Sequence, residues 1–255
     1  MWVRALLIAA ALAAAGCADA NKQPAGVPAP PPSASATPSS RPSSTVSALG
    51  GCLGPDEAQL RSLPGGLSIG VMGEGVTGVV IAYERNGSVC TWAPLADALV
   101  SRRYRVALFD YSGTQTPQHD VADVTAELRR HGVRRVFLVG GSLGGAAVLH
   151  GGVEITPAVA GVVNIAGGLP DGVAMARRLR VPLLLVAARD DSILADLDAP
   201  APRWMNQLYL AAARTPDRRL VLVPGTEHAS ALFISPQAQP VQHAVVAFLD
   251  QHNRP

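Results

Sequence analysis

The stretch that decides the fold is FLVGGSLGGA, residues 137–146. Three apolar residues run into a glycine-rich corner with Ser142 at its apex, and small residues with helical character follow. Residues 140–144, Gly-Gly-Ser-Leu-Gly, fit the nucleophile elbow, in which a serine occupies a sharp strand-to-helix turn. Such a turn needs glycines because the backbone is strained and the helix passes close to neighbouring strands. The alternative is a glycine-rich turn whose serine caps a helix, so the rest of the chain must supply a base, an acid and a sheet.

Apolar segments on both sides of this stretch predict strands separated by helices. Strands are expected at 67–72, 78–83, 104–111, 135–139, 160–166, 181–188 and 220–223, and helices at 93–102, 121–131, 144–150, 174–179, 204–213 and 241–251. The alternation is typical of a parallel sheet, and the continuous apolar runs indicate strands covered on both faces. The first two strands are close enough in sequence to pair as a hairpin. The expected fold class is α/β, with a mostly parallel central sheet and helices on both faces.

A base for Ser142 is expected at the end of a later strand. Serine is a weak nucleophile and needs a base, which needs an acid to orient it. On this architecture the chain order is Ser, then Asp or Glu, then His. The strand at 181–188 runs into Asp190 and Asp191, and the strand at 220–223 is followed by His228. Because ligands bind at the carboxyl ends of such strands, we predict His228 as the base beside Ser142, against the alternative of a solvent-exposed loop histidine.

The acid is predicted to be Asp191, with Asp190 as the alternative. Adjacent residues point in different directions, so we expect one of them to reach the imidazole and the other to hydrogen-bond loop backbone. Asp171, after the preceding strand, is a third candidate. The remaining histidines are expected on helix faces or on the surface.

The chain from about Cys52 to its C-terminus resembles the α/β-hydrolase family of serine esterases. The resemblance is carried by residues 140–144, 189–191, His228 and the stretch 83–92. Many relatives have His-Gly-x after a strand, then a tryptophan before a Pro-Leu-Ala-like helix start. Here Tyr83-Glu84-Arg85 stands in place of His-Gly-x, and Trp92 follows in register. Residues 109–113 resemble the Asp-x-Arg-Gly turn of the family, with Ser112 in place of the arginine.

The resemblance implies the α/β-hydrolase fold and an oxyanion hole built from two backbone N–H groups. One belongs to Leu143, and the other to the loop after Tyr83, at Arg85 or else at Glu84. Backbone donors do not depend on the side chain, so the loss of His-Gly leaves the hole possible. A carboxylate aimed at an oxyanion would repel it, so we expect the Glu84 side chain to point away. The segment 166–181 has room for a short helix, so no inserted cap domain is expected and the site is predicted to be open.

Residues 1–16 are typical of an export signal, with Arg4 before an apolar run that is too short to span a bilayer. Residues 14–17, Ala-Ala-Gly-Cys, resemble a bacterial lipobox with alanine where leucine is usual, which implies lipidation of Cys17 and anchoring to the outer face of the bacterial cell membrane. Ordinary signal cleavage and secretion are the alternative. Residues 17–47, rich in Pro, Ala and Ser, predict a disordered tether. Residues 48–255 are then the folded domain.

Cys52 and Cys90 are predicted to form a disulfide, because paired thiols in an exported chain are typically bridged. Two thiols alone lack the further ligands that zinc needs. The formal net charge is +2, the arginines are scattered or paired, and aromatic residues make up 4% of the chain. This composition does not indicate nucleic-acid binding.

Together these features predict a serine hydrolase that acts on carboxylic esters, with a small-molecule ester or acyl compound as substrate. The triad chemistry needs no metal or other cofactor. Thioesterase or peptidase activity on the same fold is one alternative. Another is a catalytically idle member of the family that binds a ligand or a cell-envelope partner through residues 83–85. The oligomeric state is not indicated by the sequence.

Overall fold

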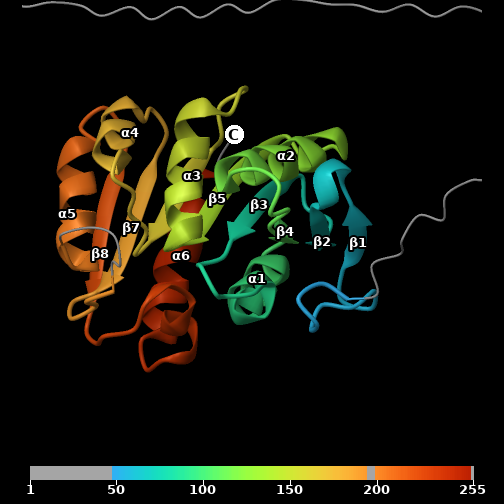
Figure 1. Ribbon diagram of the computed structural model, residues 1–255, viewed down its shortest axis with the longest axis horizontal. Coiled ribbons are helices and arrows are strands. Elements are labelled where there is room, and N and C mark those ends of the chain that lie inside the picture. The colour runs from blue at the N-terminus through green and yellow to red at the C-terminus, as the bar shows by residue number, and fades with distance from the viewer. Residues whose placement is uncertain (1–47, 194–198, 254–255) are drawn as a thin grey trace, which may run out of the picture. The chain divides into compact units, whose positions relative to one another are not determined.

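The computed structural model describes residues 48–193 and 199–253, which form one eight-stranded sheet with helices on both faces (Figure 1). The predicted signal segment 1–16, Cys17 and the predicted tether 17–47 lie outside the described residues. Within the described ranges, no helix has the length and apolar character needed to cross a membrane.

The elements follow one another as strands and helices in near-regular alternation. The strands are β1 (Gln59–Ser62), β2 (Ser68–Met72), β3 (Thr77–Ala82), β4 (Arg105–Asp110), β5 (Arg135–Gly141), β6 (Gly161–Ile165), β7 (Leu183–Ala188) and β8 (Arg218–Val223). The α-helices are α1 (Ala93–Ser101), α2 (Pro117–Arg130), α3 (Leu143–Glu154), α4 (Gly172–Arg178), α5 (Ala201–Ala211) and α6 (Ala238–His252). Short 3-10 helices are η1 (Pro64–Gly66), η2 (Val89–Trp92) and η3 (Ala229–Ile234).

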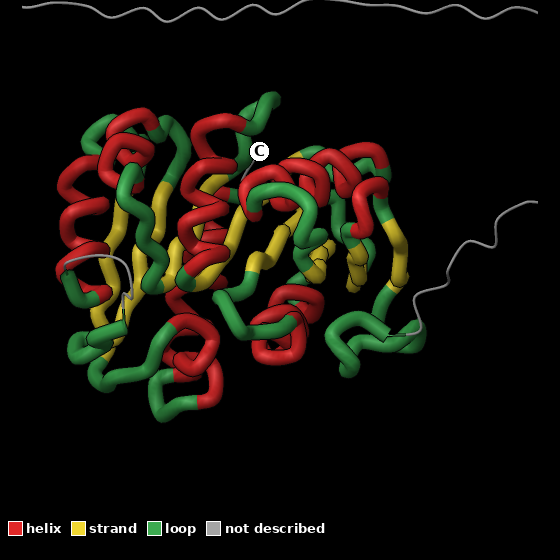
Figure 2. The backbone as a smooth tube through the Cα atoms, in the orientation of Figure 1, coloured by secondary structure: helices red, strands yellow, loops and turns green. Residues whose placement is uncertain are grey.

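The sheet has the strand order β1-β2-β4-β3-β5-β6-β7-β8, and every pair from β4 to β8 along this order is parallel. This confirms the predicted mostly parallel α/β sheet. Figure 2 shows the strands in yellow with helices in red above and below them. Among the described strands, the antiparallel pairs are β1 with β2 and β2 with β4. The strand β1 has no apolar run that would have marked it in the sequence, because it lies at the edge and exposes both of its end residues.

The predicted hairpin between the first two expected strands is wrong. β2 pairs with β4, with Ile69 opposite Phe109, and β3 lies on the far side of β4. The connecting segment passes so close to the start of β4 that a Cβ on Gly75 would overlap the carbonyl of Arg103. All six residues of β3 are buried. Both of its edges are occupied by parallel strands, β4 on one side and β5 on the other, so β2 is not its neighbour.

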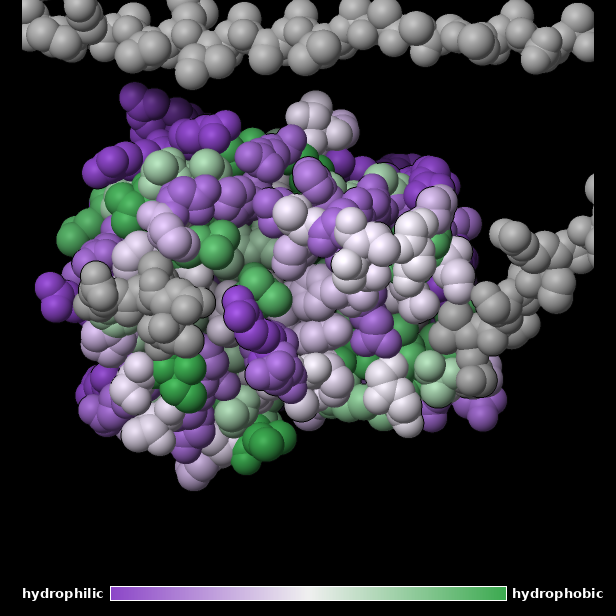
Figure 3. Space-filling view, viewed as in Figure 1, coloured by the Kyte–Doolittle hydropathy of each residue, from purple (hydrophilic) through white to green (hydrophobic). Residues whose placement is uncertain are grey.

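Alternate residues of the strands pack against different helix layers. Leu138 of β5 packs in a core shared with α2, α3, α4 and α5, whereas Phe137 and Val139 belong to the core beneath α1 and α6. This period of two is what a sheet covered on both faces requires, and it confirms the prediction of helices on both faces. On the outer face seen in Figure 3, hydrophobic side chains occur as small separate areas among hydrophilic ones.

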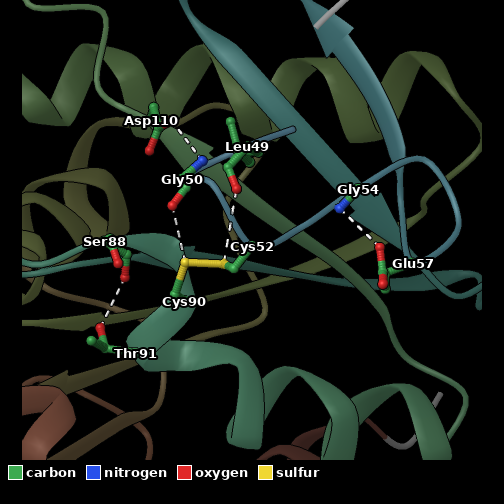
Figure 4. Close-up of a disulfide and its surroundings, with 9 residues drawn as sticks. All are labelled: Leu49, Gly50, Cys52, Gly54, Glu57, Ser88, Cys90, Thr91 and Asp110. Atoms are coloured by element: carbon green, nitrogen blue, oxygen red, sulfur yellow. Dashed lines mark hydrogen bonds between the residues drawn. A yellow bond between two sulfur atoms is a disulfide. The ribbon is translucent and has the colours of Figure 1, made fainter. Parts of the chain in front are cut away.

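The predicted disulfide between Cys52 and Cys90 is present, with the two Cα atoms 5.9 Å apart (Figure 4). It joins the segment before β1 to η2. The same segment is held at the end of β4, because the backbone N–H of Gly50 donates to Asp110 at 3.2 Å. The disulfide therefore fixes η2 near the carboxyl ends of the parallel strands, the side of the sheet where β3, β5, β7 and β8 end.

Candidate active site

Ser142 stands between β5 and α3 with φ 50° and ψ −113°, a left-handed conformation that is unusual for a residue other than glycine. Its N–H donates to the carbonyl of Ile165 at 2.9 Å, and its own carbonyl accepts from Ala146 at 3.0 Å. Its side chain makes no capping hydrogen bond to α3. The alternative interpretation, a serine that caps the helix, therefore has no support in the geometry. Ser142 is partly exposed.

The glycines around Ser142 allow backbone segments to approach closely. A Cβ on Gly140 would overlap the backbone of Gly144, and a Cβ on Gly144 would overlap the carbonyl of Ala82 at the end of β3. A Cβ on Gly167 would lie 2.6 Å from the carbonyl oxygen of Ser142. Because these neighbours are backbone atoms, they cannot move aside as a side chain would. The turn is thus locked between the ends of β3 and β6.

Asp191 and His228 are brought together by the ends of β7 and β8. Oδ2 of Asp191 lies 2.7 Å from Nδ1 of His228, and Oδ1 accepts from the backbone N–H of Ile193 at 2.9 Å. The Asp191 side chain is fully buried and that of His228 is 13% exposed. A carboxylate at Nδ1 fixes the proton there, which leaves the lone pair on Nε2. Nε2 is buried and has no hydrogen-bond partner among the described residues.

The other candidate acids lie elsewhere. Asp190 is exposed, and its backbone N–H donates to the carbonyl of Gly225 at 3.0 Å. Asp171 precedes α4 and approaches His150, with 3.3 Å between the carboxylate and Nε2. Of the three aspartates, Asp191 is the one in contact with His228.

The segment that carries His228 touches the elbow. A Cβ on Gly141 would lie 2.9 Å from the Cβ of Ala229, so the residue before Ser142 contacts the residue after His228. Ala229 and Ala166, like Ser142, have positive φ angles, 49° and 53°. Strained backbone of this kind gathers at functional sites. Nothing in the sequence distinguishes these two alanines, so sequence reasoning missed them.

The loop after β3 is fixed by side chains. The hydroxyl of Tyr111 donates to the carbonyl of Tyr83 at 2.8 Å, and the two rings pack edge to face with centroids 4.7 Å apart. Burial raises the pKa of the Tyr111 phenol well above its usual range, with a further contribution from Tyr83 and nearby carboxylates, so the hydroxyl stays protonated and can donate. A turn follows, because the N–H of Gly87 donates to the carbonyl of Glu84 at 3.0 Å. Arg85, the expected oxyanion donor, is exposed within this turn.

Leu143, the other expected donor, is the first residue of α3 and is partly exposed. The first N–H groups of a helix have no partner within the helix and carry its positive end. The backbone at Leu143 is thus suited to stabilising a negative oxygen beside Ser142.

The carboxylate of Glu84 receives two hydrogen bonds. Oε2 accepts from the indole Nε1 of Trp92 at 2.9 Å, and Oε1 accepts from the hydroxyl of Ser230. Trp92 is fully buried and Ser230 is 4% exposed. We expected only that Glu84 would point away from the oxyanion hole. Sequence reasoning did not identify Ser230, and no signal in the sequence marks it.

The described residues contain no group of three or more His, Cys, Asp or Glu side chains arranged to hold a metal ion.

The sequence model of the alpha/beta hydrolase family matches residues 86–245. No curated protein matches the chain. Among solved structures, an esterase of Pyrococcus furiosus is similar with a TM-score of 0.61 and 13% identity, over 76% of this chain and 91% of that one. A monoacylglycerol lipase of Paleococcus ferrophilus has a TM-score of 0.60 and 16% identity, over 73% and 99% of the two chains. A proline iminopeptidase of Mycobacterium smegmatis has a TM-score of 0.60 and 14% identity, over 76% and 98%.

Proposed function

Because this chain belongs to the alpha/beta hydrolase family, we propose that it hydrolyses carboxylic esters with Ser142 as nucleophile, His228 as base and Asp191 as the acid that orients the base. One observation carries the proposal. His228 is bonded to Asp191 at 2.7 Å through Nδ1, while its Nε2 is buried without a partner among the described residues, on a segment that touches the elbow. A buried polar atom left unpaired has a free-energy cost, which a catalytic role would explain.

The proposed reaction proceeds through an acyl-enzyme. Nε2 of His228 takes the proton from Oγ of Ser142 as that oxygen attacks the ester carbonyl carbon, and Asp191 stabilises the imidazolium that forms. The backbone N–H groups of Leu143 and Arg85 stabilise the oxyanion. The imidazolium then protonates the departing alcohol. Water, deprotonated by Nε2, attacks the acyl-enzyme, and the carboxylic acid leaves as Ser142 regains its proton.

The substrate class is proposed from the connection between β6 and β7, which the structure describes throughout and which holds one helix, α4. A short connection at this place supports an open site that takes esters of modest size or esters presented on a surface. The similar solved structures bear the names of an esterase, a monoacylglycerol lipase and a proline iminopeptidase. They support hydrolysis in general, so ester and peptide substrates are compared in the test.

A fluorophosphonate probe tests the nucleophile. We expect stoichiometric labelling at Ser142 in folded protein and none in Ser142→Ala, because the probe needs an activated hydroxyl. A panel of nitrophenyl esters with short and long acyl chains, beside thioesters and amino-acid amides, then identifies the leaving group and acyl length. Folded protein that takes no label would contradict the proposal and favour a binding role.

We also propose that the chain is exported and anchored through a lipid on Cys17. The support is the sequence of residues 1–17, with its apolar run and its cysteine at the expected place. Mass spectrometry of the membrane fraction is expected to find Cys17 as a lipidated N-terminus. An unmodified N-terminus beyond Cys17 would contradict the proposal.

A further inference from the structure

The carboxylate of Glu84 joins three segments that surround Ser142. We infer that Glu84 is a positioning residue, which holds the loop after β3 and the segment after His228 at the separation that the reaction needs. This inference rests on the proposed function and adds to it a residue outside the triad. It depends on the contacts of Glu84 with Trp92 and Ser230.

The contact with Trp92 connects the loop to the indole ring that packs beside Gly141, the residue before Ser142. The indole ring is fully buried, and a Cβ on Gly141 would lie 2.7 Å from its Cζ2 atom. The ring also packs against Phe233, with centroids 5.3 Å apart. A buried indole N–H needs an acceptor, and Glu84 provides it at 2.9 Å. Glu84 is thereby fixed relative to the backbone that immediately precedes Ser142.

The contact with Ser230 ties the same carboxylate to the base. Ser230 lies two residues after His228, at the start of η3, and its side chain is buried. Its hydroxyl donates to Oε1 of Glu84, which is 146 residues away in sequence. Because Ala229, between Ser230 and His228, contacts Gly141, the whole segment lies against the elbow. Any displacement of Glu84 would therefore move both the Trp92 ring beside the elbow and the segment that carries His228.

Glu84 also sets the shape of the loop itself. Its side chain folds over the turn so closely that a Cβ on Gly87 would lie 2.7 Å from the carboxyl carbon. Its carbonyl accepts from the N–H of Gly87, and Arg85 is carried inside this turn. One residue thus controls the place of the proposed oxyanion donor and, through Ser230, the place of the proposed base.

The test compares Glu84→Ala, Glu84→Gln and Ser230→Ala, with Glu57→Gln as the control. Glu57 accepts from the N–H of Gly54 in an exposed loop and links no two segments of the site. The measurements are the rate of fluorophosphonate labelling of Ser142, kcat and KM for a short nitrophenyl ester, and the solvent exchange of the indole N–H of Trp92. The melting temperature of each variant is recorded beside them.

We expect Glu84→Ala to lower the labelling rate and kcat about 100-fold, the size of effect that a misplaced group near the reaction produces. KM should change little, and the Trp92 indole N–H should exchange faster. Glu84→Gln keeps one acceptor oxygen, and Ser230→Ala keeps the Trp92 contact, so each should lose about tenfold. The double variant Glu84→Ala/Ser230→Ala should be no slower than Glu84→Ala alone, because both changes break one link. Glu57→Gln should label at the wild-type rate.

Two results would overturn the inference, and they have different consequences for the proposed function. If wild type labels but Glu84→Ala or Glu84→Gln labels equally fast at a lower melting temperature, Glu84 is merely structural and the proposed function stands. If wild type takes no label and hydrolyses no ester while its Trp92 indole N–H is protected, the proposed function fails and the inference fails with it.

Discussion

The elbow and the loop after β3 both lie at the carboxyl ends of the parallel strands, but different interactions hold them in place. The elbow is fixed by its backbone. Its glycines have no room for a Cβ, Ser142 has a positive φ angle, and the N–H of Ser142 donates to the carbonyl of Ile165. The loop is fixed by side chains, the hydroxyl of Tyr111 on one side and the carboxylate of Glu84 on the other. A backbone-locked turn tolerates little change at a few positions. A loop held by side chains can be loosened gradually, which makes its contribution measurable.

Asp191→Asn is expected to have the largest effect. The amide cannot fix the same imidazole tautomer as the carboxylate, so kcat should fall about 10⁴-fold while the elbow remains folded. Asp190→Asn is the matched control, because this exposed neighbour does not contact His228, and its kcat should stay within about twofold of wild type. Steady-state kinetics on a short ester measures both. Full turnover in Asp191→Asn would remove this residue from the triad.

Loss of the disulfide tests how firmly the loop is anchored. Cys52→Ser/Cys90→Ser should lower the free energy of unfolding by roughly 3–4 kcal/mol, because the 38-residue loop is no longer closed in the unfolded state. Urea denaturation measures the change, and reductant should destabilise wild type but not the variant. Since η2 carries both Cys90 and Trp92, ester turnover should also fall in the variant. A variant with unchanged turnover would show that Glu84 and Trp92 hold the loop without the disulfide.

Gly144→Ala tests the backbone contact between the elbow and the loop after β3. The added Cβ would overlap the carbonyl of Ala82 and lie 2.7 Å from that of Tyr83, so the backbone must shift at a cost of about 2–3 kcal/mol. Gly151→Ala, on the same helix, meets side-chain methyl groups of Leu138, Ile155 and Val121 instead of backbone. It should change the free energy of unfolding by less than about 1 kcal/mol. Equal losses in the two variants would contradict the view that backbone contact locks the elbow.

This difference also explains what could be predicted from the sequence. The elbow is local: glycine spacing around Ser142 and the apolar runs on both sides marked the turn, the parallel sheet and the helices on both faces. Asp191 and His228 follow strand ends, so their meeting at one edge followed from the topology. The loop is not local. Ser230 and Tyr111 act through single hydrogen bonds to residues 146 and 28 positions away, and such pairings leave no periodic pattern. The hairpin prediction failed for a similar reason. β2 and β3 are close in sequence, but both neighbours of β3 in the sheet, β4 and β5, lie later in the chain.

Tyr111→Phe is expected to have the smallest effect, and it sharpens the comparison from the loop side. Removing the hydroxyl leaves the carbonyl of Tyr83 without this donor but keeps the ring packing, so the free energy of unfolding should fall by about 1 kcal/mol. Turnover should fall with it, since the loop that carries Arg85 is less well fixed.

The same phenol has a pH signature. Its pKa is raised by burial above the unfolded value of about 10. Its protonated form is therefore favoured in the folded chain, and its contribution to stability is complete below pH 10 and lost as the pH rises further. Thermal unfolding between pH 8 and 11 should show wild type losing stability above pH 10 more steeply than Tyr111→Phe. Tyr104 and Tyr83, whose pKa values burial also raises, are present in both proteins, so the difference between the curves reports the loss of the Tyr111 hydroxyl. Parallel curves would mean that the Tyr111 hydroxyl does not hold the loop, and the side-chain account of this region would then depend on Glu84 alone.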